Sequence, residues 1–312
     1  MKTDDFKVKF WGVRGSHPVA DKEFLKYGGN TACVEVNAGS HRIIIDGGTG
    51  IIPLGDKLFK EHISSSENIF DRTPVNATLL LSHVHQDHIQ GLNFFKPMNL
   101  ITSKLSLLGF CGFDNSLSDT LSELVFGKSF PINMYDIKAE YSITDITESD
   151  VAVLSDESCI PCVKHIAEEK DTRPKDDEVI ISFLKAPSHP NFGVMCFKIT
   201  YCDRSVVYAS DLECYSGGSK RLEEFARNAD LLIHDSQYTT QDYLSVAQPK
   251  QGFGHSTFDM AYDIAQSANV KKLAFFHFDP SYNDTKLTSI EKLFKSKNKD
   301  YFFAKEGLEI CL

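Results

Sequence analysis

The most informative segment of the sequence is Leu79-Leu80-Leu81-Ser82-His83-Val84-His85-Gln86-Asp87-His88. Three histidines and an aspartate fall within six residues, directly after an apolar run that is typical of a strand. In an extended segment residues i and i+2 point the same way, so His83 and His85 can converge on one cation, whereas a turn lets Asp87 and His88 face a second. Imidazole and carboxylate groups suit zinc, manganese or iron. The stretch therefore predicts a strand that ends in a metal site.

Two ions need more ligands than this stretch holds, and later strands end in suitable residues. His189 precedes Pro190, which favours an extended loop. Asp211 follows the predicted strand that begins at Ser205, and His277 ends the predicted strand 273–277. Each of the three alone would be an ordinary surface or core residue. Together they supply the ligands that the first stretch lacks.

Short apolar runs separated by turn residues predict many strands and few helices. The expected strands are 7–11, 33–36, 42–45, 77–82, 179–185, 195–200, 205–209, 231–234 and 273–277. One clear helix has apolar residues at 261, 264, 265 and 268, and Ser256 and Asp259 have the spacing of a capping box before it. Strands with chemistry at their ends predict sheets packed on sheets, with helices outside.

The chain is expected to form one domain over residues 1–312, with an insertion at 101–178 that caps the site or forms a dimer contact, because the periodicity weakens there. The charged run 168–178 within it is typical of a solvated loop. The eight cysteines are too scattered for a disulfide framework. Cys159 and Cys162 form a close pair, and a CxxC without a second pair nearby is only a weak signal of a zinc knuckle or a redox motif.

The charge balance bears on the partners of the protein. The chain has 312 residues, and 33 Lys and Arg against 43 Asp and Glu give it a net charge of −10. A charge of this sign does not attract polyanions, so RNA binding would need a local basic patch. The first residues are charged where a secretory signal would be apolar, and no run of about 18 apolar residues could span a bilayer. We therefore expect a cytoplasmic protein that does not enter a membrane.

The order and spacing of the candidate ligands resemble those of the metallo-β-lactamase fold superfamily over nearly the whole chain. In chain order these residues are His83, His85, Asp87, His88, His189, Asp211 and His277. The segments 10–16, 27–31 and 46–50 resemble the branch that contains ribonuclease Z-like and cyclic-phosphodiesterase-like hydrolases. The resemblance implies an α+β fold, a four-layer αβ/βα sandwich, with the site at the edge between its two sheets.

The same resemblance implies how the ligands are shared between two divalent metal ions. His83, His85 and His189 would hold one ion. Asp87, His88 and His277 would hold the other, and Asp211 would bridge the two. Zinc is the expected metal, with manganese or iron as alternatives.

Residue types narrow the chemistry within the superfamily. Members similar to flavodiiron proteins, which reduce oxygen or nitric oxide, carry Glu where this chain has His85, so hydrolysis is favoured over redox chemistry. The β-lactamases themselves generally have a zinc-binding Cys or lack a bridging carboxylate, whereas Asp211 suits a bridge. Thioester hydrolases of the glyoxalase type share all seven ligands and remain an alternative.

His255, in the segment 252–257, is similar to the His-Ser-Thr segment of ribonuclease Z-like enzymes. This similarity implies a catalytic role, in which protonated His255 stabilises charge at phosphorus or donates a proton to the departing alkoxide. Asp87 would orient a metal-bridging hydroxide as well as bind metal. Asp46, and after it Asp235, are the candidates for carboxylates that orient the ligand imidazoles.

The leading hypothesis from the sequence is a metal-dependent phosphodiesterase that opens small cyclic nucleotides, because the chain lacks the long basic arm of ribonuclease Z-like enzymes. The alternatives are an RNA-processing endonuclease of ribonuclease Z type and a thioester or lactone hydrolase. Outside the enzymes, the alternative is a metal-stabilised module that binds or senses nucleotides. The resemblance also implies a homodimer.

Overall fold

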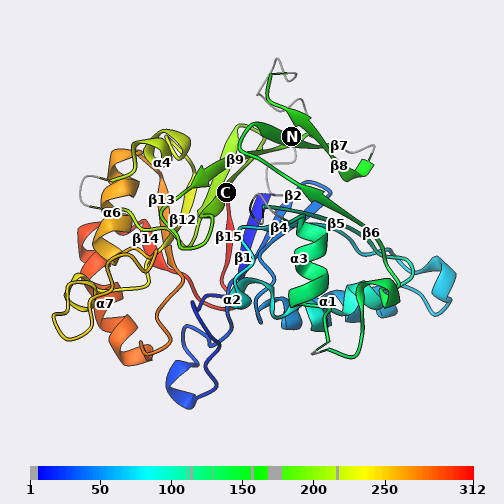
Figure 1. The fold of residues 1–312 in the computed structure, drawn as a ribbon, viewed down its shortest axis with the longest axis horizontal. Coiled ribbons are helices and arrows are strands. Elements are labelled where there is room, and N and C mark those ends of the chain that lie inside the picture. Colours follow the sequence, from blue (N-terminus) through cyan, green and yellow to red (C-terminus); the bar gives the residue numbers. More distant parts are fainter. Residues whose placement is uncertain are drawn as a thin grey trace.

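The computed structural model describes residues 6–110, 112, 115–128, 130–155, 158–167, 178–215 and 218–312, apart from the side chain of Cys159. Two mixed β-sheets face each other in the centre of the molecule (Figure 1). Within these described residues, the first sheet has seven strands in the order β15-β1-β2-β3-β4-β5-β6, and the second has eight in the order β14-β13-β12-β11-β10-β9-β7-β8.

The strands of the first sheet are β1 (Phe6–Gly12), β2 (Cys33–Ala38), β3 (His41–Ile45), β4 (Asn76–Leu81), β5 (Lys104–Gly109), β6 (Glu140–Asp145) and β15 (Glu309–Cys311). Those of the second sheet are β7 (Asp150–Ser155), β8 (Ser158–His165), β9 (Val179–Ala186), β10 (Val194–Tyr201), β11 (Arg204–Ala209), β12 (Leu231–Asp235), β13 (Lys272–Phe276) and β14 (Tyr301–Phe303). Strands β3 to β6 are parallel to one another, as are β11 to β14. The strands expected from the sequence all lie in these two sheets.

The helices are α1 (Ile51–Ser64), α2 (Gln86–Ile89), α3 (Leu117–Leu124), α4 (Lys220–Phe225), α5 (Thr240–Tyr243), α6 (Phe258–Ser267) and α7 (Asp284–Lys297). Short 3₁₀ turns are η1 (Lys22–Phe24), η2 (Ile69–Asp71), η3 (Leu92–Phe94), η4 (Lys96–Asn99) and η5 (Met134–Asp136). Helices α1 and α3 cover the outer side of the first sheet, and α4, α6 and α7 cover that of the second (Figure 1). These four layers confirm the α+β sandwich that the resemblance implies.

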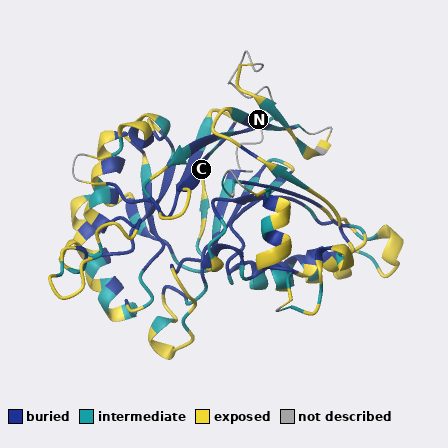
Figure 2. Cartoon of the chain, viewed as in Figure 1, coloured by how far each residue is buried: buried dark blue, intermediate teal, exposed yellow. Residues whose placement is uncertain are grey.

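Strand alternation explains why the first sheet buries both of its faces. On β3, Ile43 and Ile45 belong to the apolar cluster shared with the second sheet, whereas Ile44 belongs to the cluster under α1 and α3. Leu80 and its neighbours Leu79 and Leu81 divide in the same way on β4. Figure 2 shows the consequence, because buried residues follow the sheets and exposed residues lie on the outer sides of the helices.

Three features of the fold differ from the sequence expectations or extend them. Residues 101–178 supply β5 and β6 to the first sheet and β7 and β8 to the second, so the region forms part of both sheets of the sandwich. The sequence did not single out α1, because Pro53 and Gly55 interrupt its helical pattern, although proline is tolerated in a first helical turn. It also did not single out the polar helix α7, which Asn283 caps by accepting from the Lys286 N–H.

The cap of α6 is one residue later than the sequence predicted. Thr257 caps the helix, with its side chain accepting from the Met260 N–H, instead of the expected pair Ser256 and Asp259. The Ser256 hydroxyl is already engaged, because it donates to the Leu212 carbonyl oxygen at 2.6 Å. Most of the charged run, residues 168–177, lies outside the described residues. Within the part of the chain that the structure describes, no helix has the length and apolarity needed to cross a membrane.

Candidate metal centre

The candidate site residues meet at one end of the sandwich, where parallel strands of both sheets end. Strand β4 leads into Ser82 and the histidine-rich segment, and the short helix α2 then turns the chain so that Asp87 and His88 face inward. From the second sheet, Asp211 follows β11 and His277 follows β13. The carboxyl ends of parallel strands are where ligand sites form in sheets of this kind.

The first group of side chains consists of His83, His85 and His189, whose nitrogens lie within 4.8 Å of one another. His85 Nδ1 and His189 Nε2 are 3.0 Å apart. Two imidazole nitrogens on one tetrahedral zinc ion, each at about 2.0–2.1 Å, would lie roughly 3.3 Å apart. The His83 Nε2 atom is buried and has no hydrogen-bond partner among the described residues. Such an orphaned nitrogen fits a site that a cation completes.

The second group consists of Asp87, His88, Asp211 and His277, and all four side chains are buried. His88 Nε2 lies 3.2 Å from His277 Nε2, and Asp87 Oδ2 lies 3.2 Å from the same His277 atom. The donor set is therefore two imidazoles and two carboxylates, which suits zinc, manganese or iron.

Asp211 belongs to the second group and also faces the first. Its Oδ1 atom faces the first group, at 3.8 Å from His83 Nε2 and 4.0 Å from His189 Nε2. Its Oδ2 atom faces the second group, at 3.0 Å from His88 Nε2 and 3.2 Å from His277 Nε2. One carboxylate thus presents a different oxygen to each group, as a bridging ligand must.

The charge state of the site is set by burial and by its carboxylates. Burial lowers the pKa of His83, His85 and His189, which favours the neutral imidazole that binds metals. Burial also opposes a charge on His88, but Asp211, Asp87 and Asp46 overcome it and raise its pKa well above the usual value. These carboxylates bring negative charge into the site, and a cation bound between the histidines would neutralise it.

The two aspartates of the second group stay ionised. Burial alone would raise the pKa of Asp87, but His88 and His277 hold it far below its usual value. Against the same effect of burial, His277 and His88 keep the pKa of Asp211 well below its usual range. Both carboxylates therefore carry negative charge at neutral pH.

Asp46 supports the part of the site that follows β4. Its Oδ2 atom accepts from His88 Nδ1 at 2.8 Å and from the Tyr208 hydroxyl at 2.6 Å. Its Oδ1 atom accepts from the Ser82 backbone N–H at 2.8 Å. These bonds orient His88 so that its Nε2 atom points at Asp211, as expected of a carboxylate that orients a metal-binding imidazole.

Asp235 supports the part of the site that comes from the second sheet. It accepts from the Asp211 N–H at 3.0 Å, from the Ser256 N–H at 3.0 Å and from His255 Nδ1 at 2.8 Å. Burial lowers the pKa of His255, but the charge of Asp235 and this hydrogen bond outweigh it, so the net shift is upward. The His255 ring stacks on that of His277, with centroids 5.2 Å apart and planes at 18°.

Glu213 is a site residue that the sequence analysis missed. This buried carboxylate accepts from the Gly252 N–H at 2.9 Å, from the Gly254 N–H at 3.1 Å and from the Tyr243 hydroxyl. The Gly254 carbonyl oxygen in turn accepts from His189 Nδ1 at 3.0 Å. Glu213 therefore fixes the loop that precedes His255, and this loop is also hydrogen-bonded to His189. Its position two residues after Asp211 was the available signal.

The segments that resemble a known branch of hydrolases have structural reasons for their composition. A Cβ atom on Gly15 would lie 2.4 Å from the His277 ring, and the Ser16 N–H donates to Asp87 at 2.7 Å. Arg14 is fully buried and donates to the carbonyl oxygens of Gly28 and Tyr282, both at 2.7 Å. These contacts fasten the loops after β1 around the site.

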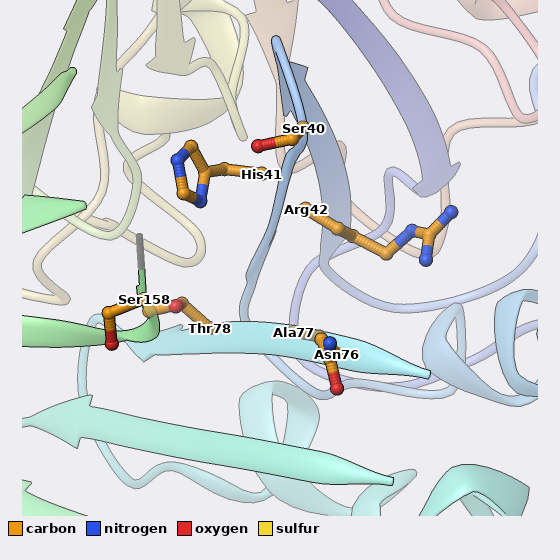
Figure 3. A pocket seen from close by; sticks show the side chains of 7 residues that line it. All are labelled: Ser40, His41, Arg42, Asn76, Ala77, Thr78 and Ser158. Carbon is orange, nitrogen blue, oxygen red and sulfur yellow. The ribbon is translucent and has the colours of Figure 1, made fainter. Parts of the chain in front are cut away.

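A polar pocket of about 200 Å³ lies away from this centre, at the amino-terminal ends of β3 and β4 (Figure 3). His41 and Arg42 point to opposite sides of β3 there, and Arg42 is paired with Glu35 at 3.0 Å. No carboxylate belongs to its lining residues within the described part of the chain. The described donor groups that could hold a metal lie at the other end of the sheet.

The chain is similar to several known proteins over most of its length. A family model described as "Beta-lactamase superfamily domain" matches residues 41–278. Ribonuclease Z of Thermoplasma acidophilum is 25% identical in an alignment of 300 positions that covers 90% of this chain and 89% of that protein. Ribonuclease Z of Picrophilus torridus is 26% identical in an alignment of 329 positions that covers 97% of this chain and 95% of that protein.

A solved structure gives the same fold. The metallo-β-lactamase fold protein YhfI from Bacillus subtilis superimposes with a TM-score of 0.62 at 19% identity, covering 98% of this chain and 99% of that one.

Proposed function

The chain belongs to the β-lactamase superfamily, and from that premise we propose that it is a metal-dependent phosphodiesterase that cleaves RNA, in the manner of a ribonuclease Z. The observation that carries the proposal is the pair of histidine-rich groups on either side of Asp211, with His255 Nδ1 3.9 Å from Asp211 Oδ1. Such an arrangement suits displacement at phosphorus, where two oxygens must be stabilised on opposite sides.

The two groups would divide the metal ions as the resemblance implies. His83, His85 and His189 would hold one ion, and Asp87, His88 and His277 the other, with Asp211 shared. Two divalent ions at such a site supply Lewis acidity toward a phosphoryl oxygen and lower the pKa of water to about 7. Asp87, which stays ionised, would orient the attacking water by accepting its hydrogen bond.

His255 would handle the proton of the leaving group. Its Nδ1–H donates to Asp235, which leaves Nε2 as the atom that can carry a proton toward the substrate. Asp235 favours the protonated ring, and stacking on His277 fixes its plane. In the proposed reaction His255 donates this proton to the departing alkoxide, a role that typically accelerates a reaction by about 10²–10⁴-fold.

The choice of RNA revises the sequence hypothesis of a small cyclic nucleotide. The relatives that align over about nine-tenths of the chain are named ribonuclease Z, which favours the RNA alternative. A cyclic nucleotide remains the second candidate, because the net charge of −10 does not attract a long polyanion. The complete donor set argues against a module that only binds nucleotides. Zinc as the native metal and a homodimer remain predictions.

Product analysis tests the proposal. The zinc- and manganese-loaded protein is incubated with a precursor tRNA, with 3′,5′- and 2′,3′-cyclic nucleotides and with a thioester, and the products are separated by chromatography. We expect cleavage of the precursor tRNA that disappears in Asp87→Ala. Opening of a cyclic nucleotide alone would restore the second candidate. Turnover of the thioester alone, or of nothing, would contradict the proposal.

A further inference from the structure

An apolar pocket of about 250 Å³ opens directly beside the first histidine group. His83 and His85 form one wall, and Phe110, Leu124, Pro190 and Phe192 contribute the apolar walls. Phe110 and Leu124 come from residues 101–178, and Pro190 and Phe192 follow the candidate ligand His189. The pocket is smaller than the roughly 300–1,000 Å³ of sites that enclose a whole drug-sized ligand, so it suits a single ring system.

The Phe192 side chain is held in place although it is 53% exposed. A Cβ atom on Gly112 would lie 3.0 Å from the Phe192 ring, so one side of the ring lies against the bare backbone of Gly112. Phe192 lines the pocket and is half exposed, so its ring offers a flat apolar surface there.

The backbone at this pocket adopts a conformation that bulky residues rarely take. Asn191, Phe192 and Gly193 have φ angles of 61°, 74° and 77°. A positive φ at a phenylalanine is a genuine outlier, and such outliers cluster at ligand sites. The Asn191 side-chain nitrogen is 3.3 Å from His85 Nε2. The turn that presents Phe192 is therefore tied to a candidate metal ligand.

We propose that this pocket binds the nucleobase next to the scissile phosphate. The base stacks on Phe192 and packs against the apolar wall of Phe110 and Leu124. This inference rests on the proposed function, because a phosphodiester of a nucleic acid carries a planar aromatic base within reach of its phosphate. Stacking on aromatic rings tolerates any base and needs no positive charge, which suits a chain of net charge −10. Lys185 places a positive charge beside this wall, with its Nζ atom 4.1 Å from the Phe110 ring centroid.

Calorimetric binding tests the pocket without turnover. The zinc-loaded protein is titrated with adenosine 5′- and 3′-monophosphate and with the base-free ribose 5- and 3-phosphates. We expect at least one nucleotide to bind roughly 10-fold more tightly than its base-free counterpart, the range of one stacked base. Phe192→Ala and Phe192→Leu should lose this preference and leave binding of the base-free phosphate unchanged. Both variants keep a Cβ atom, so neither relieves the positive φ as glycine would.

The matched control is Phe70→Ala, which removes an 83% exposed phenylalanine remote from the pocket and should leave the preference intact. Equal binding of nucleotide and base-free phosphate in the wild type, or a preference that survives in both Phe192 variants, would overturn the inference. A wild type that prefers the nucleotides but cleaves no phosphodiester would refute the proposed function and leave the base pocket standing. Cleavage of a phosphodiester without any preference for a base would support the proposed function and refute the base pocket.

Discussion

In the first sheet, four candidate metal ligands lie in one continuous segment after β4, whereas the second sheet supplies His189, Asp211 and His277 from three separate loops. Each half rests on its own buried carboxylate, Asp46 under the first and Asp235 under the second. The continuous half takes its geometry from one strand and one helical turn. The assembled half depends on contacts between loops, so it should be the half that is more easily disturbed.

The largest expected effect comes from removing the group that joins the halves. Asp211→Ala should lower kcat/KM for the cleaved phosphodiester by more than about 100-fold, beyond the range seen when partners of metal ligands are changed. Steady-state kinetics and metal content by mass spectrometry measure this. The matched control is Asp203→Ala, because Asp211 and Asp203 both have a positive φ, of 57° and 61°, but Asp203 lies in the turn between β10 and β11. Activity of the Asp211 variant within 10-fold of the wild type would show that the halves work without the bridge.

The next prediction separates the halves through their supporting carboxylates. Asp46→Asn should weaken zinc binding by about 10–100-fold, because Asp46 orients the candidate ligand His88. Asp235→Asn should lower kcat by a similar factor while zinc binding changes less, because its shortest side-chain contact is with His255, at 2.8 Å, whereas the candidate ligand His277 lies at 3.6 Å. Competition with a chromophoric chelator and steady-state kinetics measure the two effects. The opposite pattern would mean that the assembled half carries the metal affinity.

The same comparison explains how much the sequence could predict. The ligands in Ser82 to His88 could be predicted from the sequence because residues that are close in space there are also close in the chain. The apolar strands β3, β4 and β11 to β13 could be predicted for the same reason. Glu213 was missed because its partners, Gly252 and Gly254, lie about forty residues away and become neighbours only in the fold. The misplaced cap of α6 has a similar cause, since the Ser256 hydroxyl is taken by Leu212.

A smaller effect is expected from loosening the loop of the assembled half. Glu213→Gln keeps the size of the side chain but places an amide group among N–H donors that need an acceptor, so it should lower kcat about 10-fold. It should also cost roughly 1–3 kcal/mol of unfolding free energy, the penalty for a buried donor left without a partner. Urea denaturation and kinetics measure both, with the exposed Glu224→Gln as the control. Unchanged kcat with lowered stability would leave Glu213 a purely structural role.

The smallest effect lies outside both halves. Burial alone would raise the pKa of Glu291, but hydrogen bonds from Tyr27 and Lys295 and the charge of Lys305 lower it. A carboxyl whose pKa is lowered by folding adds stability above its unfolded pKa of about 4.3, and this is lost as pH falls through the folded pKa. Glu291→Gln should therefore lower the free energy of unfolding by about 1 kcal/mol at pH 7, and this difference from the wild type should shrink below about pH 4. Urea denaturation at both pH values measures this difference. A difference in unfolding free energy that persists in acid would contradict a stabilising role for the ionised Glu291 carboxylate.

The two halves together are proposed to hold two metal ions with Asp211 between them. A crystal structure of the zinc-loaded protein, with anomalous scattering at the zinc edge, would locate these ions. We expect two anomalous peaks, one at about 2.0–2.2 Å from His83, His85 and His189 and one at the same distance from Asp87, His88 and His277, with an Asp211 oxygen on each. A single peak, or a zinc ion held elsewhere, would contradict this arrangement.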